Sequence, residues 1–150
     1  MVLPITRVFL TPPWLAGIIN LRGDIVAVID LARFMDLPPT APAIDRIHRP
    51  TGASLASGRR EDHSRIVICR HEGKSAGLVV DEMAELRSID SESIQPPPPT
   101  LTGNGAALLA GVVTVDDGAA LRVLDLGKLF HSERLRAFQR PDGRDGEEIR

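Results

Sequence analysis

Two apolar segments near the start of the chain are separated by a short polar break, which is the pattern of a β-hairpin. They cover residues 17–21 and 25–31, and both are rich in β-branched side chains. Arg22-Gly23-Asp24 lies between them, and the glycine can take the positive φ that a tight turn needs. The second segment is apolar at nearly every position, so we expect both of its faces to be covered. A short helical turn over residues 32–37, ended by Pro38-Pro39, should follow.

The later part of the chain predicts two more hairpins and one further strand. Residues 66–70 and 75–80 flank a polar turn. Residues 84–89 alternate apolar and polar side chains, as a half-buried strand does. Residues 109–130 contain a hairpin that turns at Asp116-Asp117-Gly118, followed by a short helix.

Two segments lack this periodicity. Residues 38–64 are dominated by Pro, Gly, Ser and Arg, which predicts a solvated, mobile loop. Near the end, Ser132 is suited to cap a short helix that Leu135 and Phe138 would dock on the strands. Residues 141–150 are Gly-rich and charged, and we expect them to fray.

The first hairpin is repeated later in the chain. Residues 15–19 (LAGII) return 94 positions later as residues 109–113 (LAGVV), and residues 29–34 return 95 positions later. A duplicated unit predicts two similar lobes. If the second unit begins near Arg65, an offset of 94 to 95 positions puts the matching start of the first unit before Met1. We therefore expect the first lobe to lack its opening strands, or to be completed by another segment.

The composition argues against nucleic-acid-binding and membrane-bound classes of protein. The chain has 150 residues, a net charge of −2, one Trp and no Tyr. Basic side chains are scattered, so neither a nucleic-acid track nor a polybasic membrane patch is predicted. No apolar run is long enough for a membrane span, which makes a cytoplasmic protein the expectation.

The segment Thr11–Leu31 resembles the central hairpin of CheW-like domains. Its Asn20-Leu21-Arg22-Gly23 core matches the family pattern, and Ala27 replaces a frequent proline. Residues 76–83 (AGLVVDEM) and the hairpin with its short helix over residues 109–130 match two later family segments. The likeness covers roughly residues 5–131.

The resemblance implies an all-β fold of two five-stranded, SH3-like barrels around a shared core. Lobe 1 would cover residues 5–37, incompletely, and lobe 2 residues 65–131, within a domain over residues 1–131. Residues 132–150 would form a short helix and a flexible tail. The family binds the cytoplasmic tip of chemoreceptors and the regulatory domain of the histidine kinase CheA. It has no catalytic centre and no cofactor, and no metal site is expected in this chain.

Arg22 is the leading candidate for partner binding. A guanidinium at a hairpin tip offers several donors to carboxylates or carbonyls of a partner helix. The matching arginine of the family contributes to receptor and kinase coupling, and the resemblance gives that role to Arg22. The alternative is an internal salt bridge that holds the turn.

Four neighbouring residues complete the candidate partner-binding set. Gly17 and Gly23 either permit close approach of a partner backbone or meet an unusual φ in a bulge or turn. Asn20 is interpreted mainly as a hydrogen-bond partner of the turn backbone. Leu21 belongs to the set as part of the matching segment.

Other candidate chemistry has simpler explanations. Asp30 and Asp125 recur in both units and are expected to cap the following helical turns rather than to form a catalytic dyad. Gly73-Lys74-Ser75 lacks the preceding glycine of a phosphate-binding loop. Cys69 is expected to be a small buried hydrophobe and Trp14 to seal the core. The histidines show no metal-ligand spacing: His48, His63, His71 and His131.

The sequence therefore predicts a non-enzymatic chemotaxis adaptor located at receptor arrays beneath the inner membrane. The alternatives are a regulatory fragment of a larger signalling protein, or a small β-scaffold hydrolase or nucleotide-binding enzyme. The enzyme alternative needs a nucleophile–base pair or a phosphate loop, and neither pattern is found in the sequence.

Overall fold

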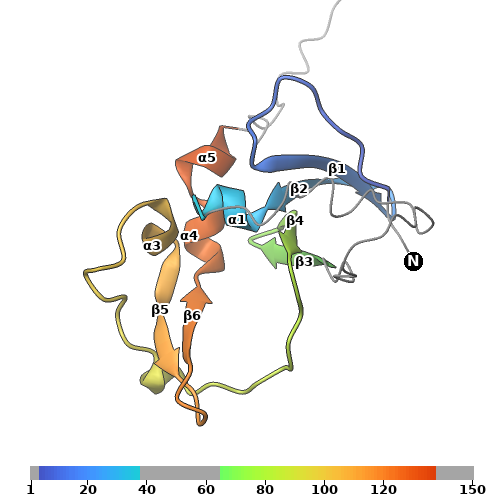
Figure 1. Ribbon diagram of the computed structural model, residues 1–150. Coiled ribbons are helices and arrows are strands. Elements are labelled where there is room, and N and C mark those ends of the chain that lie inside the picture. Colours follow the sequence, from blue (N-terminus) through green and yellow to red (C-terminus); the bar gives the residue numbers. More distant parts are fainter. Residues whose placement is uncertain (1–3, 38–64, 138–150) are drawn as a thin grey trace, which may run out of the picture.

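The computed structural model describes residues 4–37 and 65–137, and six strands are the main regular elements of this part of the chain (Figure 1). The strands are β1 (Leu15–Leu21), β2 (Asp24–Asp30), β3 (Arg65–His71), β4 (Lys74–Val80), β5 (Leu109–Thr114) and β6 (Ala120–Leu124). The helical segments are α1 (Leu31–Phe34), η1 (Ser91–Ser93), α3 (Asn104–Ala107), α4 (Leu126–Phe130) and α5 (Glu133–Arg136). The prediction of an all-β chain with short helices is confirmed. The predicted loop over 38–64 and tail over 141–150 lie outside the described residues.

Four strands form one sheet in the order β1-β2-β4-β3. The β1/β2 and β3/β4 pairs are antiparallel hairpins, as predicted, whereas β2 and β4 run parallel with Ile29 beside Leu78. Neighbouring residues of a strand point to opposite faces, and both Val28 and Ile29 are 0% exposed. The expectation that both faces of this strand are covered is confirmed for residues 28–30, whereas Ile25 near its start is exposed.

The strands β5 and β6 form a separate two-stranded sheet. Residues 65–80 were expected in one lobe with this second hairpin, but in the described residues β4 pairs with β2 and not with β5 or β6; the division into lobes stays a prediction. Ala76, Leu78 and Val79 of β4 are at most 3% exposed, and the apolar β2 supplies the neighbour that their burial requires. The proposed domain limit at residue 131 stays a prediction.

Residues 81–90 form an extended segment outside any strand, so the predicted strand over 84–89 is wrong. In Figure 1 this segment runs away from the four-stranded sheet toward the far end of β5 and β6. Leu86 is fully exposed and Ile89 is 40% exposed. An alternating pattern becomes a strand only where a neighbouring backbone can pair with it, and none of the described strands pairs with this segment.

The internal repeat is reproduced in the backbone. Each hairpin has an irregularity at the same place, between Leu15 and Gly17 in β1 and between Leu109 and Gly111 in β5. Each also receives a short antiparallel bridge from a preceding segment, Thr6 to Ile18 and Gln95 to Val112. The prediction of a duplicated unit is therefore confirmed at the level of local geometry.

The two units share one hydrophobic core. Trp14 and Leu108 lie at equivalent positions, since their carbonyls accept from the backbone N–H groups of Asp30 and Asp125 at 2.8 and 2.9 Å. Both side chains belong to one buried cluster, in which the Trp14 ring meets the Phe34 ring edge-on at 5.0 Å. Trp14 thus seals the core, as predicted.

Candidate partner-binding surface

The tip of the β1/β2 hairpin is a two-residue turn made by Arg22 and Gly23. Leu21 pairs with Asp24, and the turn residues have φ values of 55° and 98°. Positive φ at both central positions is the type I′ geometry, which matches the twist of the flanking strands. The side-chain oxygen of Asn20 accepts a hydrogen bond from the Gly23 N–H at 2.8 Å, so Asn20 stabilises the turn.

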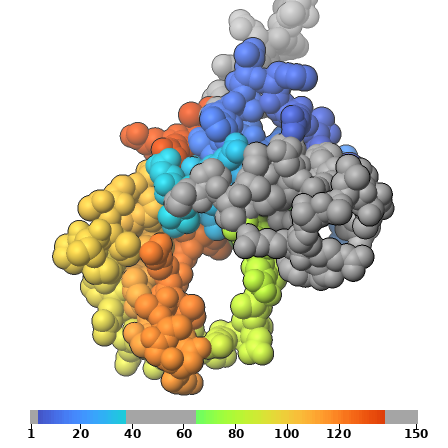
Figure 2. All heavy atoms as spheres, viewed as in Figure 1, coloured from blue at the N-terminus to red at the C-terminus, as the bar shows by residue number. Residues whose placement is uncertain are grey.

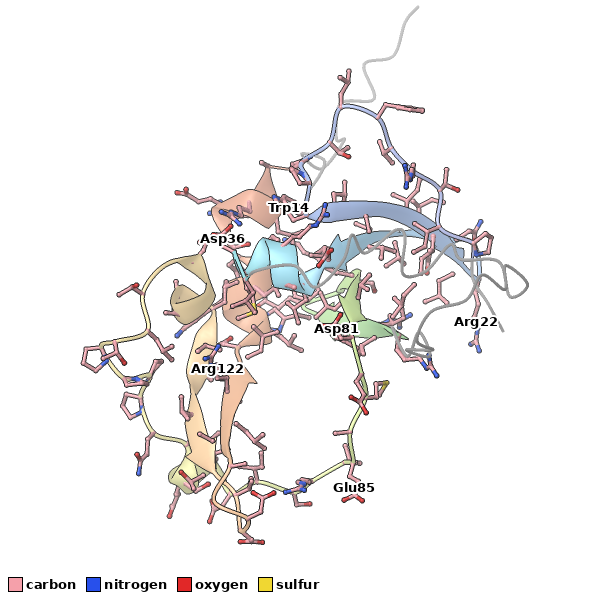
Figure 3. All side chains as sticks on the ribbon, viewed as in Figure 1. Trp14, Arg22, Asp36, Asp81, Glu85 and Arg122 are labelled. Carbon is pink, nitrogen blue, oxygen red and sulfur yellow. The ribbon has the colours of Figure 1, made fainter. Side chains whose placement is uncertain are left out.

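Arg22 is exposed on this rigid turn. In Figure 3 its side chain extends away from the four-stranded sheet at the edge of the molecule. Within residues 4–37 and 65–137, its guanidinium has no hydrogen bond or ion pair, unlike that of Arg33, which donates to the Pro13 carbonyl at 3.1 Å. The alternative of an internal salt bridge is not realised in the described part of the chain.

An apolar side chain lies next to the turn. Ile25 is 64% exposed although it belongs to a strand whose later residues are buried. Asp24 is exposed as well. The hairpin tip therefore presents a cation, an anion and an aliphatic side chain within four consecutive residues, which is a suitable composition for a protein contact.

Gly17 and Leu21 are explained by contacts inside the chain. A Cβ at Gly17 would lie 2.4 Å from the Thr6 carbonyl oxygen, so the backbone that approaches this glycine closely is the chain's own. Leu21 is half-buried against the inner cluster of Ile19 and Val26. Gly23, in contrast, has open space beside it, and its positive φ is its main constraint.

The repeated aspartates act as helix caps. Asp30 and Asp125 each precede a short helix, and their Oδ1 atoms accept from the N–H of Arg33 at 3.2 Å and of Lys128 at 3.0 Å. The predicted capping role is confirmed. Cys69 packs against the shared core, where burial raises the pKa of its thiol, but the side chain is half-buried and not the fully buried hydrophobe that was predicted.

The second sheet has an outer surface that sequence reasoning missed. In the space-filling view an opening separates β6 from the extended segment after β4 (Figure 2). Exposed apolar side chains lie on both elements: Leu121 is 37% exposed on β6, and Met83 is 62% exposed on the segment. In the described residues β6 pairs only with β5, so its other edge is free of strand pairing. The matching edge of β2 carries β4.

Two more groupings were missed because their members are exposed or distant in sequence. Val8, Phe9 and Leu10 form an exposed apolar loop before β1, with Leu10 fully exposed. His71 and His131 lie close together although 60 positions separate them. Among the described residues, no helix has the length and apolar character to cross a membrane.

Comparison with known proteins agrees with this architecture. Residues 1–134 match the CheW-like domain family. The chain is 34% identical over 124 residues to the chemotaxis protein CheW of Treponema pallidum, a match that covers 83% of this chain and 64% of that protein. It is 30% identical over 132 residues to the protein FrzA of Myxococcus xanthus, which covers 87% of this chain and 70% of FrzA.

A solved structure is similar as well. The scaffolding protein TtCheW from Thermoanaerobacter tengcongensis superposes with a TM-score of 0.63 at 32% sequence identity, covering 88% of this chain and 77% of that one. The expected SH3-like double-barrel fold is the fold of this relative. The chain spans about two thirds of the length of the Treponema protein (64%). The sequence, the repeated hairpins and the fold agree: the chain belongs to the CheW-like domain family.

Proposed function

We propose that the chain is a non-enzymatic adaptor that couples the cytoplasmic tip of chemoreceptors to the regulatory domain of a CheA-type histidine kinase. The observation that carries the proposal is the exposed Arg22 side chain on its type I′ turn, without an ion-pair partner in the described part of the chain. Membership of the CheW-like family and similarity to a scaffolding protein of known structure support the same function.

Arg22 is well suited to recognise a helical receptor tip. Its planar guanidinium has five N–H donors, which can engage carboxylates and backbone carbonyls together. The turn beneath it is fixed by the Asn20–Gly23 hydrogen bond, so binding would order only the side chain. Ile25 adds apolar area beside the cation. Gly23 allows the turn, and we assign Asn20, Leu21 and Gly17 supporting roles inside the fold.

We assign the kinase contact to the outer surface of the second sheet, formed by the free edge of β6 and exposed Leu121. An unpaired strand edge offers backbone donors and acceptors to another β-sheet, and an adjacent leucine supplies apolar area. The Arg22 turn belongs to the other sheet (Figure 3). An adaptor with contacts on separate sheets can hold two partners at once. Binding to the cytoplasmic tip of receptors would place the chain in the cytoplasm at receptor arrays.

A titration tests the receptor contact. Arg22→Ala should weaken binding of a soluble receptor cytoplasmic fragment by about 1–3 kcal/mol, the range of an interface hot spot. Arg87→Ala is the matched control, because Arg87 is exposed on the extended segment after β4. Equal affinity of the two variants for the fragment would argue against the assignment.

A further inference from the structure

Three side chains with metal-binding atoms meet where the two units of the fold touch. His71 ends β3, Glu72 begins the following turn, and His131 directly follows α4. One ligand atom from each lies within 4.8 Å of the others. The two histidines come from opposite ends of residues 65–137, so only the folded chain brings them together.

The separations suit a single ion. His131 Nε2 lies 3.2 Å from Glu72 Oε2, and His71 Nε2 lies 3.9 Å from Glu72 Oε1. In a tetrahedral zinc site with bonds of about 2.0–2.2 Å, neighbouring ligand atoms are about 3.4 Å apart. One observed separation is just below that value and the other is 0.5 Å above it. The two distances end on different oxygens of Glu72, so binding of one ion requires its carboxylate to turn one oxygen toward both rings.

The ring of His131 is oriented by the backbone. Its Nδ1 lies 2.8 Å from the carbonyl oxygen of Gly127, in the preceding turn of α4. A hydrogen bond from Nδ1–H to that carbonyl leaves the lone pair on Nε2, the nitrogen that faces Glu72. Metal-binding histidines characteristically make this second hydrogen bond to a carbonyl or carboxylate, which fixes the tautomer and the ring plane.

The ring of His71 is positioned by packing. It stacks on the buried Phe130 ring at 5.9 Å with an interplanar angle of 29°, and it meets the His131 ring edge-on at 5.8 Å. Phe130 is 2% exposed and belongs to the shared core. Two of the three ligands are therefore oriented by the fold itself.

We propose that His71, Glu72 and His131 form a site for a divalent transition-metal ion of the zinc type. Two imidazoles with one carboxylate favour Zn²⁺, Ni²⁺ or Cu²⁺ over Mg²⁺ and Ca²⁺, which prefer oxygen ligands. A fourth position stays open to water or to a ligand from a partner. The side chains are 32%, 62% and 55% exposed, so the ion can enter from solvent. The bound ion would connect the β3/β4 turn to α4, and so the first sheet to the second unit.

Zinc binding to the full-length, tag-free chain tests the site, measured by competition with a chromophoric chelator. One Zn²⁺ should bind per chain, and Co²⁺ should give the visible absorption of a four-coordinate site. His131→Asn and His71→Asn should each weaken binding by at least 10- to 100-fold, because each removes a direct ligand. Glu72→Gln should also weaken binding, since a neutral amide is a poorer ligand. Zn²⁺ should raise the melting midpoint of the wild-type chain but not of these variants.

The matched control is Glu85→Gln, which changes an exposed glutamate on the extended segment after β4 and should leave Zn²⁺ binding as in the wild type. Melting in EDTA checks that each variant is folded. Wild-type affinity in the folded His131→Asn variant would overturn the proposal, and so would an equal loss of binding in Glu85→Gln.

Discussion

The Arg134 guanidinium donates to both carboxylate oxygens of Asp36 at 3.0 Å and so joins α5 to the end of the first unit. The same guanidinium donates to the Phe34 carbonyl at 2.8 Å, where α1 ends. These contacts span about 100 positions of sequence and fix the C-terminal helix against the first hairpin unit. The Arg134–Asp36 ion pair is partly exposed, with side chains 36% and 54% accessible, so solvent screening reduces its contribution to stability. Most of the stabilisation by Arg134 therefore comes from its hydrogen bond to the Phe34 carbonyl at the end of α1.

Replacing Arg134 with alanine should therefore lower the free energy of unfolding by about 1 kcal/mol. The loss combines one charge-assisted bond to a backbone carbonyl with a solvent-screened ion pair. Urea denaturation measures it, with Arg136→Ala as control because Arg136 is exposed in the same helix. If both variants unfold at the same urea concentration, the bridge contributes nothing to stability.

The equivalent glycines of the two hairpins should both be intolerant of alanine, Gly17 the more so because its φ of 150° also disfavours a side chain. A Cβ at Gly17 would lie 2.4 Å from the Thr6 carbonyl oxygen, and one at Gly111 would lie 2.3 Å from that of Gln95. Both substitutions should cost roughly 2 kcal/mol or more, since the bridging segment must move away. Gly118→Ala is the control, because its surroundings are open and only its positive φ opposes a side chain. Thermal unfolding of the three variants measures the loss of stability at each glycine. A small loss for Gly111→Ala beside a large loss for Gly17→Ala would show that the two hairpins do not depend on the same close contact.

The half-buried thiol of Cys69 makes stability fall at alkaline pH. Desolvation raises the pKa of Cys69 in the folded chain, so the folded state keeps its proton where the unfolded state, with a pKa of about 8.5, has lost it. The folded state then binds more protons, and the free energy of unfolding decreases as pH rises through that value. Cys69→Ala should remove this part of the pH dependence. An identical alkaline slope in the variant and the wild type would assign the slope to other groups.

Leu121 tests the proposed kinase surface. A change to arginine should weaken binding of the isolated kinase regulatory domain by roughly tenfold or more, because it places a charge in an apolar contact. The side chain is 37% exposed, so the fold should tolerate the change. Receptor-fragment binding should be unaffected, which separates this surface from the Arg22 turn. Kinase-domain affinity that does not respond to Leu121→Arg would remove β6 from the interface.

The local features of the fold could be predicted from sequence, because short-range chemistry determines them. Arg22-Gly23 between β-branched runs specifies its turn, and Asp30 or Asp125 before a short apolar stretch specifies a cap. The parallel pairing of β2 with β4 could not be predicted, since residues 38–64 separate these strands and parallel pairing leaves no local signal. The alternating residues 84–89 suggested a strand, but periodicity alone does not supply a pairing partner.

The candidate partner-binding site could be predicted only in part from the sequence. The exposure of Arg22 followed from its place at a hairpin tip, but the internal contacts of Gly17 and Leu21 required the structure. The proximity of His71 to His131 had no sequence signal, because metal-ligand motifs are recognised by short spacings. The free edge of β6 could not be predicted from sequence, because it depends on the pairing of β4 with β2 and not with β6 in the described residues.

The proposed adaptor function requires the Arg22 turn to transmit receptor control to the kinase. The most direct test reconstitutes receptor fragment, CheA-type kinase and adaptor, and measures the rate of kinase autophosphorylation. The wild type and Arg87→Ala should stimulate the kinase equally, whereas folded Arg22→Ala should lose most of the stimulation. Full stimulation by Arg22→Ala would contradict the account.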